Sequence, residues 1–345
     1  MITATIGRDM ILDQKVKISG DSYNQSILIL GTSGSGKSFA AKCIEQKLAE
    51  DGAAVLVMNF NETHSDVRGT FVRWIHVREQ GFPFGLFDKN NSQERNAQEA
   101  LKIFEGVEKL FTRQKRSLRM ALLMATKICK DQGEDFLIIR RCLGRIAIEE
   151  EALADSCEAL LDRFFEVFHD VRINAAEVII PGKITILDYS GYDGSTQRML
   201  TEFALSALWR DAKNNGIGNR IPVYVVLDEF QNLNCCPGGV LESVLREGRK
   251  FQCHLMLITQ SLSTFPREIR PIFQLPATRL LFPLVEKDSR EILQSLPFPR
   301  ADSEKLLRSL SKGLCIGVGR LEMEDTIVEK PLVLTFCKEE KNGQK

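Results

Sequence analysis

The sequence predicts an α/β fold in which a doubly wound, mostly parallel sheet carries an inserted α-helical subdomain. Short, continuous apolar runs such as residues 26–30 and 223–227 are typical of strands that are buried on both faces. These runs alternate with helical stretches, as they do in α/β proteins. Between residues 96 and 171 there is no proline, and apolar residues recur at helical spacing. The length of 345 residues suits one such domain with one insertion.

The chain begins with a strand–helix–strand unit. The first 25 residues form a short β segment, in which the alternation at residues 15–18 predicts an edge strand or a hairpin. Residues 26–30 predict a buried strand, residues 37–50 a helix with one apolar face, and residues 53–58 a second buried strand. A unit of this kind, about thirty residues long, indicates a parallel sheet.

The middle of the chain predicts the inserted subdomain. By their apolar spacing, residues 96–171 contain three or four amphipathic helices. The alternative is that these helices only cover the sheet. We predict a core of residues 26–95 and 172–337, an insert of residues 96–171, and a loose polar tail of residues 338–345.

The remainder of the core alternates strands with helices. Strands are predicted at residues 184–187, 223–227, 254–258, 278–282 and 313–318, and helices at residues 197–212 and 241–249. Because strands and helices follow one another in turn, we expect helices on both faces of the sheet.

A phosphate-binding loop follows the first buried strand. The pattern G-x-x-x-x-G-K-[ST] is matched by Gly31, Thr32, Ser33, Gly34, Ser35, Gly36, Lys37 and Ser38. Its glycines let backbone N–H groups face a phosphate, and the helix that follows points its positive end at the same anion. We expect Lys37 to contact the β- and γ-phosphates of ATP, Ser38 to bind Mg²⁺, and Phe39 to lie against the nucleotide.

Two carboxylates follow the apolar strand at residues 223–227. Asp228 and Glu229 stand at its carboxyl end, where ligands bind in open parallel sheets. We predict that Asp228 holds Mg²⁺ and that Glu229 polarises the attacking water. This prediction requires the phosphate loop and the acid pair to lie on neighbouring strands. The alternative is a strand that merely ends in an acidic turn.

Three further polar residues are candidates for the same reaction. Gln260 ends the next predicted strand and is a candidate sensor of the γ-phosphate or the water; alternatively it faces solvent. Arg249 is a candidate for donation into the site of a neighbouring subunit, with Arg246 in reserve, because a guanidinium there neutralises charge on the γ-phosphate. The alternative for these arginines is a solvated basic helix end.

The charge balance excludes a generally basic surface. Lys plus Arg and Asp plus Glu are 46 each, so the formal net charge is zero. A local basic cluster in the predicted insert is a candidate DNA contact: Arg113, Lys115, Arg116 and Arg119. The alternative, which we favour, is an exposed helix face.

The cysteines and histidines indicate neither a metal centre nor a disulfide framework. The nine cysteines include no Cys-x-x-Cys pair, and the histidines are interpreted as structural: His64, His76, His169 and His254. We see no signal peptide and no apolar run long enough to span a membrane. We therefore expect a cytoplasmic protein without a membrane span.

These segments together resemble the HerA/FtsK superfamily of ring-forming ATPases. The phosphate loop and residues 227–233 match family motifs, and residues 246–251 with 257–261, which hold Arg249 and Gln260, are the most specific match. Residues 184–190 and 312–317 resemble strands of HerA-like proteins, so the likeness covers about residues 26–335. Two departures are a short N-terminal segment where HerA proteins carry a β-barrel, and Asn59 near a position that is often acidic.

The resemblance implies a RecA-like P-loop core, and a homo-oligomer that is a hexameric ring. It implies ATP hydrolysis between subunits, with Arg249 as the finger given in trans and Gln260 as the sensor. It also implies movement of double-stranded DNA in partnership with a nuclease or effector protein. Two alternatives remain open: an ATPase that energises conjugative or type IV secretion, and a nucleotide-gated assembly scaffold whose turnover is incidental.

Overall fold

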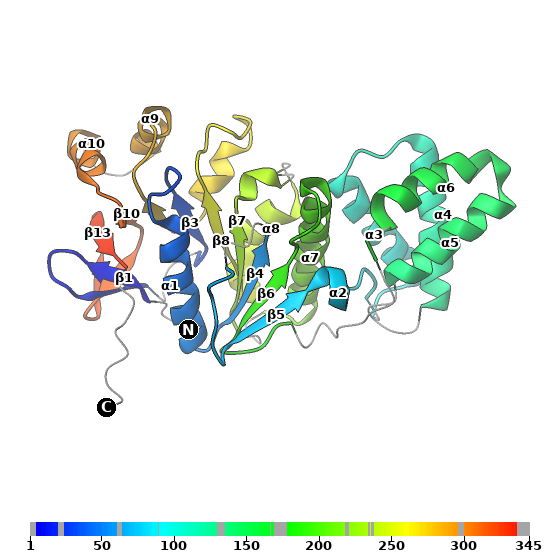
Figure 1. Cartoon of the computed structure of the whole chain (residues 1–345), viewed down its shortest axis with the longest axis horizontal. Helices are drawn as coiled ribbons and strands as arrows, with labels where there is room; N and C mark the ends of the chain where they lie inside the picture. The colour runs from blue at the N-terminus through cyan, green and yellow to red at the C-terminus, as the bar shows by residue number, and fades with distance from the viewer. Residues whose placement is uncertain are drawn as a thin grey trace.

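The computed structural model describes residues 5–19, 24–60, 64–88, 90–129, 135–165, 167–168, 178–217, 221–233, 235, 238–295 and 300–336. These residues build one 13-stranded sheet with helices on both faces, and a group of helices extends the molecule beyond one end of the sheet (Figure 1). None of the described helices is long and apolar enough to cross a membrane.

The strands are short and the helices range from one turn to six. The strands are β1 (Thr5–Asp9), β2 (Lys15–Ile18), β3 (Ile27–Leu30), β4 (Ala54–Asn59), β5 (Val72–His76), β6 (Ile184–Asp188), β7 (Val223–Asp228), β8 (Cys253–Thr259), β9 (Thr278–Leu281), β10 (Leu314–Val318), β11 (Leu321–Met323), β12 (Thr326–Val328) and β13 (Leu332–Thr335). The α-helices are α1 (Lys37–Glu50), α2 (Val77–Gln80), α3 (Gln93–Val107), α4 (Thr112–Ile128), α5 (Asp135–Glu149), α6 (Ala154–Leu160), α7 (Gly194–Asn214), α8 (Val240–Glu247), α9 (Glu286–Ser295) and α10 (Arg300–Ser309).

The strand order divides the sheet into two parts. Seven strands in the order β9-β3-β8-β7-β4-β6-β5 pair in parallel and form the larger part. The other six, β12-β11-β2-β1-β13-β10, pair antiparallel and continue the sheet from β9. The strand at Lys15–Ile18 is therefore the second arm of a hairpin with β1. It is an inner strand, because β11 covers its other side.

One expectation about the order of the strands is wrong. The phosphate-loop strand β3 and the acidic strand β7 are not neighbours, because β8 lies between them and pairs with both. The carboxyl ends of β3, β8 and β7 still meet at one edge of the sheet, since all three strands run in the same direction.

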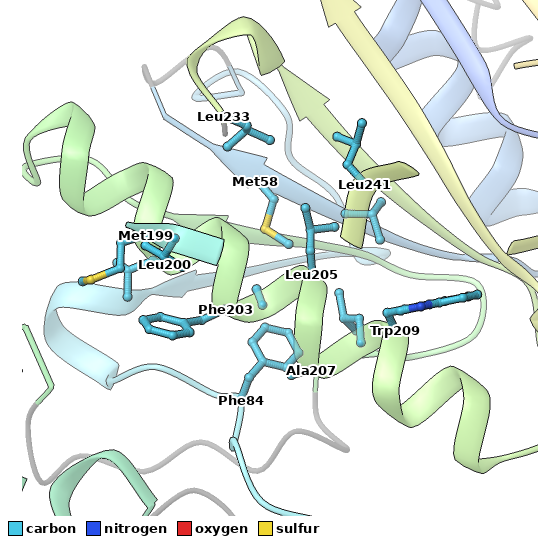
Figure 2. Packing of buried hydrophobic residues seen from close by; sticks show 14 of the residues in the cluster. Met58, Phe84, Met199, Leu200, Phe203, Leu205, Ala207, Trp209, Leu233 and Leu241 are labelled. Carbon is cyan, nitrogen blue, oxygen red and sulfur yellow. The ribbon is translucent and has the colours of Figure 1, made fainter. Parts of the chain in front are cut away.

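The alternating side chains of the buried strands supply two cores. Ile27 and Ile29 of β3 face α1, whereas Leu28 and Leu30 belong to the core beneath α7 and α8. Such burial on both faces explains the continuous apolar runs and confirms the doubly wound arrangement. Figure 2 shows α7 laying a row of apolar side chains against the sheet, where Met58 of β4 lies close to Leu205.

Helices α3 to α6 lie together beyond the β5 end of the sheet (Figure 1). Their core is continuous with that of the sheet. Phe104 of α3 and Phe136 of α5 both meet Phe203 of α7, at ring-centroid distances of 4.9 and 5.1 Å. This aromatic cluster joins the helices to α7, and the domain boundaries at residues 96 and 171 stay a prediction.

Candidate nucleotide-binding site

The loop between β3 and α1 is shaped by its glycines. Gly34 and Gly36 have φ angles of 73° and 113°, in the region that side chains other than glycine rarely adopt. A Cβ on Gly31 would lie 2.5 Å from the Cβ of Phe282, and one on Gly36 would lie 3.1 Å from the Cα of Gly313. The three glycines of the pattern are therefore required by backbone conformation and by close packing.

Two segments far along the chain hold this loop in place. The backbone N–H of Thr32 donates to the carbonyl oxygen of Pro283 at 2.8 Å. The backbone N–H of Gly313 donates to the carbonyl oxygen of Ser35 at 2.9 Å. Pro283 follows β9 and Gly313 precedes β10. Sequence reasoning missed both contacts, because no local pattern marks a residue that supports a distant loop.

The start of α1 offers an anion-binding surface. Its N-cap is Gly36, no side chain caps it, and its first turn carries no acidic residue. The N–H groups of Lys37, Ser38 and Phe39 lack intrahelical acceptors because they lie in that first turn. Free N–H groups and the helix dipole together favour a phosphate at this point.

The buried lysine of the loop fits an anion. The Oγ of Ser35, by contrast, is enclosed by protein and has no hydrogen-bond partner among the described residues. The ammonium of Lys37 donates to the carbonyl oxygen of Thr32 at 2.9 Å, and the residue is only 8% exposed. Burial lowers the pKa of Lys37, and the charges of Asp228 and Glu229 partly oppose that effect. A phosphate would give the ammonium of Lys37 an anionic partner, so this residue fits the predicted ligand.

The acid pair stands at the end of β7. Asp228 is 9% exposed, and burial together with the neighbouring Glu229 raises its pKa, against the opposing charges of His64 and Lys37. Glu229 has a φ of 51° and donates its backbone N–H to the Oδ1 of Asp228 at 2.9 Å. A divalent cation would stabilise the ionised form of this buried carboxylate, so Asp228 fits the part of a magnesium ligand.

Gln260 contacts the predicted water-polarising residue directly. Its Nε2 donates to the Oε1 of Glu229 at 3.0 Å. Next to it, the Thr259 hydroxyl donates to the amide oxygen of Gln231 at 2.7 Å, which ties the end of β8 to the segment after β7. Gln260 therefore does more than face solvent.

The strand register brings these groups to one edge. Leu30 of β3 pairs with Thr259 of β8, and Asp228 of β7 pairs with Ile258. The loop after β3, Gln260 after β8 and Glu229 after β7 consequently leave the sheet side by side. This is the edge at which ligands bind in open parallel sheets.

Arg249 lies at the opposite edge. It is exposed and precedes β8, whose seven residues run through the sheet toward Gln260. At about 3.3 Å per residue, the length of β8 separates Arg249 from the phosphate-loop edge by roughly 20 Å. Within the described residues no carboxylate forms an ion pair with Arg249, whereas Arg246 pairs with Glu242 at 2.6 Å.

A buried histidine–glutamate pair at α1 was missed by sequence reasoning. His64 and Glu45 of α1 are 1% and 0% exposed, and the Nε2 of His64 lies 3.1 Å from the Oε1 of Glu45. Burial lowers the pKa of His64, but Glu45 outweighs it and leaves the pKa above its ordinary value. The pair links α1 to the segment after β4. His64 is thus structural, as expected, and His169 lies outside the described residues.

The basic cluster lies away from this edge. Its members are on α4, in the group of helices beyond β5 (Figure 1). Arg113, Arg116 and Arg119 are exposed, and Lys115 pairs with Glu105 at 2.8 Å. An exposed helix face with one ion pair is what the structure shows, and the DNA contact stays a prediction.

The sequence is similar to that of the helicase HerA. A family model for the central domain of the helicase HerA matches residues 5–208. The DNA double-strand break repair helicase HerA of Saccharolobus solfataricus is 20% identical over 349 residues, which cover 95% of this chain and 67% of that protein. The protein of the same name from Sulfurisphaera tokodaii is 23% identical, with 95% of this chain and 69% of that protein covered.

Solved structures resemble the fold of the whole chain. VirB4 of Thermoanaerobacter pseudethanolicus matches with a TM-score of 0.73 and 18% identity, over 99% of this chain and 97% of that chain. The plasmid coupling protein TrwB, in complex with ADP and Mg²⁺, matches with a TM-score of 0.58 and 14% identity, over 93% and 87% of the two chains. At these identities the likeness shows the fold.

Proposed function

Because the chain belongs to the family of the central domain of the helicase HerA, we propose that it is a Mg²⁺-dependent ATPase that moves double-stranded DNA. The observation that carries this proposal is the meeting of Lys37, Asp228, Glu229 and Gln260 at one edge of the sheet, through the register of β3, β8 and β7. A phosphate cradle, a metal-binding acid and a second acid for water together make up the groups that ATP hydrolysis needs.

Each group has a distinct task. The N–H groups of residues 31–38 and the ammonium of Lys37 hold the phosphates, and Ser38 and Asp228 hold Mg²⁺. When bound, the metal neutralises charge on the phosphate oxygens. Phe39, which is 40% exposed at the start of α1, is available to lie against the nucleotide.

Glu229 accepts the proton of the attacking water in this proposal. Its Oε1 already accepts from Gln260, so Oε2 remains to face the water. Gln260 thereby orients the carboxylate, and a γ-phosphate close to Gln260 would compete for the same amide. Hydrolysis and the sensing of the phosphate are coupled through one hydrogen bond.

The position of Arg249 supports a ring of several copies. This guanidinium lies at the edge opposite its own phosphate loop and cannot reach that loop past β8. It is, however, exposed and free of carboxylate partners among the described residues. We therefore propose that Arg249 enters the site of a neighbouring copy, where it stabilises charge on the γ-phosphate, and that the copies form a hexameric ring, as the resemblance to the HerA/FtsK superfamily implies.

ATP turnover measured with and without double-stranded DNA tests the proposal. We expect DNA to raise the rate for the wild-type chain and turnover to vanish in Glu229→Gln, which keeps the shape of the site. If the rate of ATP turnover is the same with and without DNA, translocation is refuted, whereas the ATPase assignment still stands. A cytoplasmic location and a nuclease or effector partner belong to the same proposal, and co-purification from cells tests the partner.

A second candidate is an ATPase that energises conjugation or type IV secretion. The fold likeness to VirB4 and TrwB favours keeping it, because those folds cover nearly the whole chain. The genes beside this one separate the two functions. Channel genes favour secretion, and nuclease or defence genes favour the DNA translocase.

A further inference from the structure

A cavity of about 510 Å³ lies apart from the phosphate loop. Its walls include polar, charged and aromatic side chains: Asn59, Arg68, Trp74, His76, Asp188 and Ser190. Small-ligand sites in proteins measure roughly 300–1,000 Å³ and combine aromatic surface with a few placed polar groups. The cavity therefore has the size and the composition of a ligand site.

The cavity is distinct from the nucleotide site at the loop. Asn59, Asp188 and His76 end β4, β6 and β5, whereas Val72 begins β5 and Gly69 precedes it, so the cavity extends along one face of β5 from the phosphate-loop edge of the sheet. Three strands, β8, β7 and β4, stand between β3 and β6. Four inter-strand steps of about 4.8 Å place the phosphate loop after β3 roughly 19 Å from Asp188, whereas Asn59 ends β4, the strand beside β7 and its Asp228.

Asp188 organises the floor of the cavity. Its carboxylate accepts from the Asn59 amide at 3.2 Å, the His76 Nδ1 at 2.9 Å, and both the N–H and the hydroxyl of Ser190 at 3.1 and 2.9 Å. Burial raises the pKa of Asp188, but these hydrogen bonds outweigh it and keep the pKa below its ordinary value. These hydrogen bonds compensate the negative charge of Asp188. Its carboxylate therefore serves to orient the side chains that surround it.

The groups available to a ligand include two aromatic rings and one cation. The rings of Trp74 and His76 stack with centroids 5.9 Å apart and planes 18° apart. Since His76 uses Nδ1 for Asp188, its Nε2 is available to a ligand. Arg68 is exposed, and no described carboxylate pairs with its guanidinium.

We propose that this cavity binds a nucleoside phosphate, with the base stacked on the Trp74–His76 pair and the phosphate held by Arg68. Aromatic rings take any base because every base has a flat face, and a guanidinium matches two phosphate oxygens at once. The nucleoside phosphate is either a free nucleotide or one unit of a single strand. Both offer the same chemistry to these side chains.

The test uses the fluorescence of Trp74 in a chain whose phosphate loop is disabled. The chain has two tryptophans, so Trp209→Phe leaves Trp74 as the reporter, and Lys37→Ala removes the other nucleotide site. We expect AMP to quench Trp74 saturably, and Arg68→Ala to weaken AMP binding about tenfold. Arg95→Ala, an exposed arginine on α3, is the matched control and should change nothing.

A second comparison distinguishes a free nucleotide from one unit of a single strand. Stronger binding of a 5′-phosphorylated single-stranded oligonucleotide than of AMP supports a strand, and the reverse supports a free nucleotide. Equilibrium dialysis measures AMP binding without a tryptophan reporter. It therefore repeats the test in the Lys37→Ala chain, which keeps Trp209. The proposal is overturned if neither AMP nor the oligonucleotide binds saturably, or if Arg68→Ala leaves the observed binding unchanged. Neither outcome depends on ATP hydrolysis at the phosphate loop.

Discussion

Replacing Gly248 by alanine tests how the arginine segment is positioned. Gly248 is buried at the junction of α8 and the 3₁₀ turn Gly248–Phe251, with a φ of −54°. Its backbone conformation suits any residue, so the requirement for glycine is steric. A Cβ there would lie 2.0 Å from the backbone oxygen of Cys253 and 3.3 Å from Val244.

The size of the effect follows from that overlap. A Cβ is not found closer than 3.0 Å to such an atom, so the turn must move by about 1 Å. Crowding of this kind costs about 1–3 kcal/mol of unfolding free energy. Because Arg249 follows directly, it moves too, and a shift of about 1 Å in a catalytic group can lower turnover on the order of 10²-fold. Loss of the guanidinium in Arg249→Ala should lower turnover roughly 10³- to 10⁵-fold.

The assay pairs ATP turnover with urea unfolding of the same preparations. Gly144→Ala, in α5, is the matched control because a Cβ there has no neighbour within 4 Å among the described residues. It should leave turnover unchanged and hold or raise stability. If Gly248→Ala matched the wild-type chain in both measurements, the steric argument and the placement of Arg249 would both be refuted.

Three other substitutions have defined outcomes. Lys37→Ala should abolish binding of a fluorescent ATP analogue, because the charge beneath the phosphates is lost. Gln260→Ala should keep that binding but lower turnover on the order of 10²-fold, since Glu229 loses its donor. Burial, with the charge of Arg249, lowers the pKa of His254 from 6.5 to about 4, so this group's contribution to stability is present above pH 6.5 and is lost as pH falls toward 4. This loss amounts to an unfolding free energy on the order of 3 kcal/mol between pH 6.5 and 4. His254→Leu should abolish this pH dependence, as measured by urea unfolding at several pH values across this range.

Features contained in one segment could be predicted from the sequence. The predicted strand at residues 223–227 and helix at residues 37–50 match β7 and α1 to within a residue. Asp228 and Glu229 were placed correctly at a strand end because the polar residues follow the apolar run directly. Glycine, lysine and strand–helix context together define the phosphate loop without any knowledge of its partners.

The order of the strands could not be predicted. β7 and β8 are both fully buried apolar strands, so nothing in either run states which one pairs with β3. The choice depends on which faces pack against α1 and α7, and that is a property of the whole core. The antiparallel strands were harder still, because β11 and β12 have three residues each and carry little periodic pattern.

His76 illustrates a second limit. Alone in the sequence it is an isolated histidine, and we interpreted it as structural. Only the parallel pairing of β5 with β6 brings it beside Asp188, which lies 112 positions further along the chain. Trp74 lies on the same face of β5 as His76, since alternate residues of a strand point the same way. A site whose members come from different strands exists only in the pairing, so it is invisible to any search along one segment.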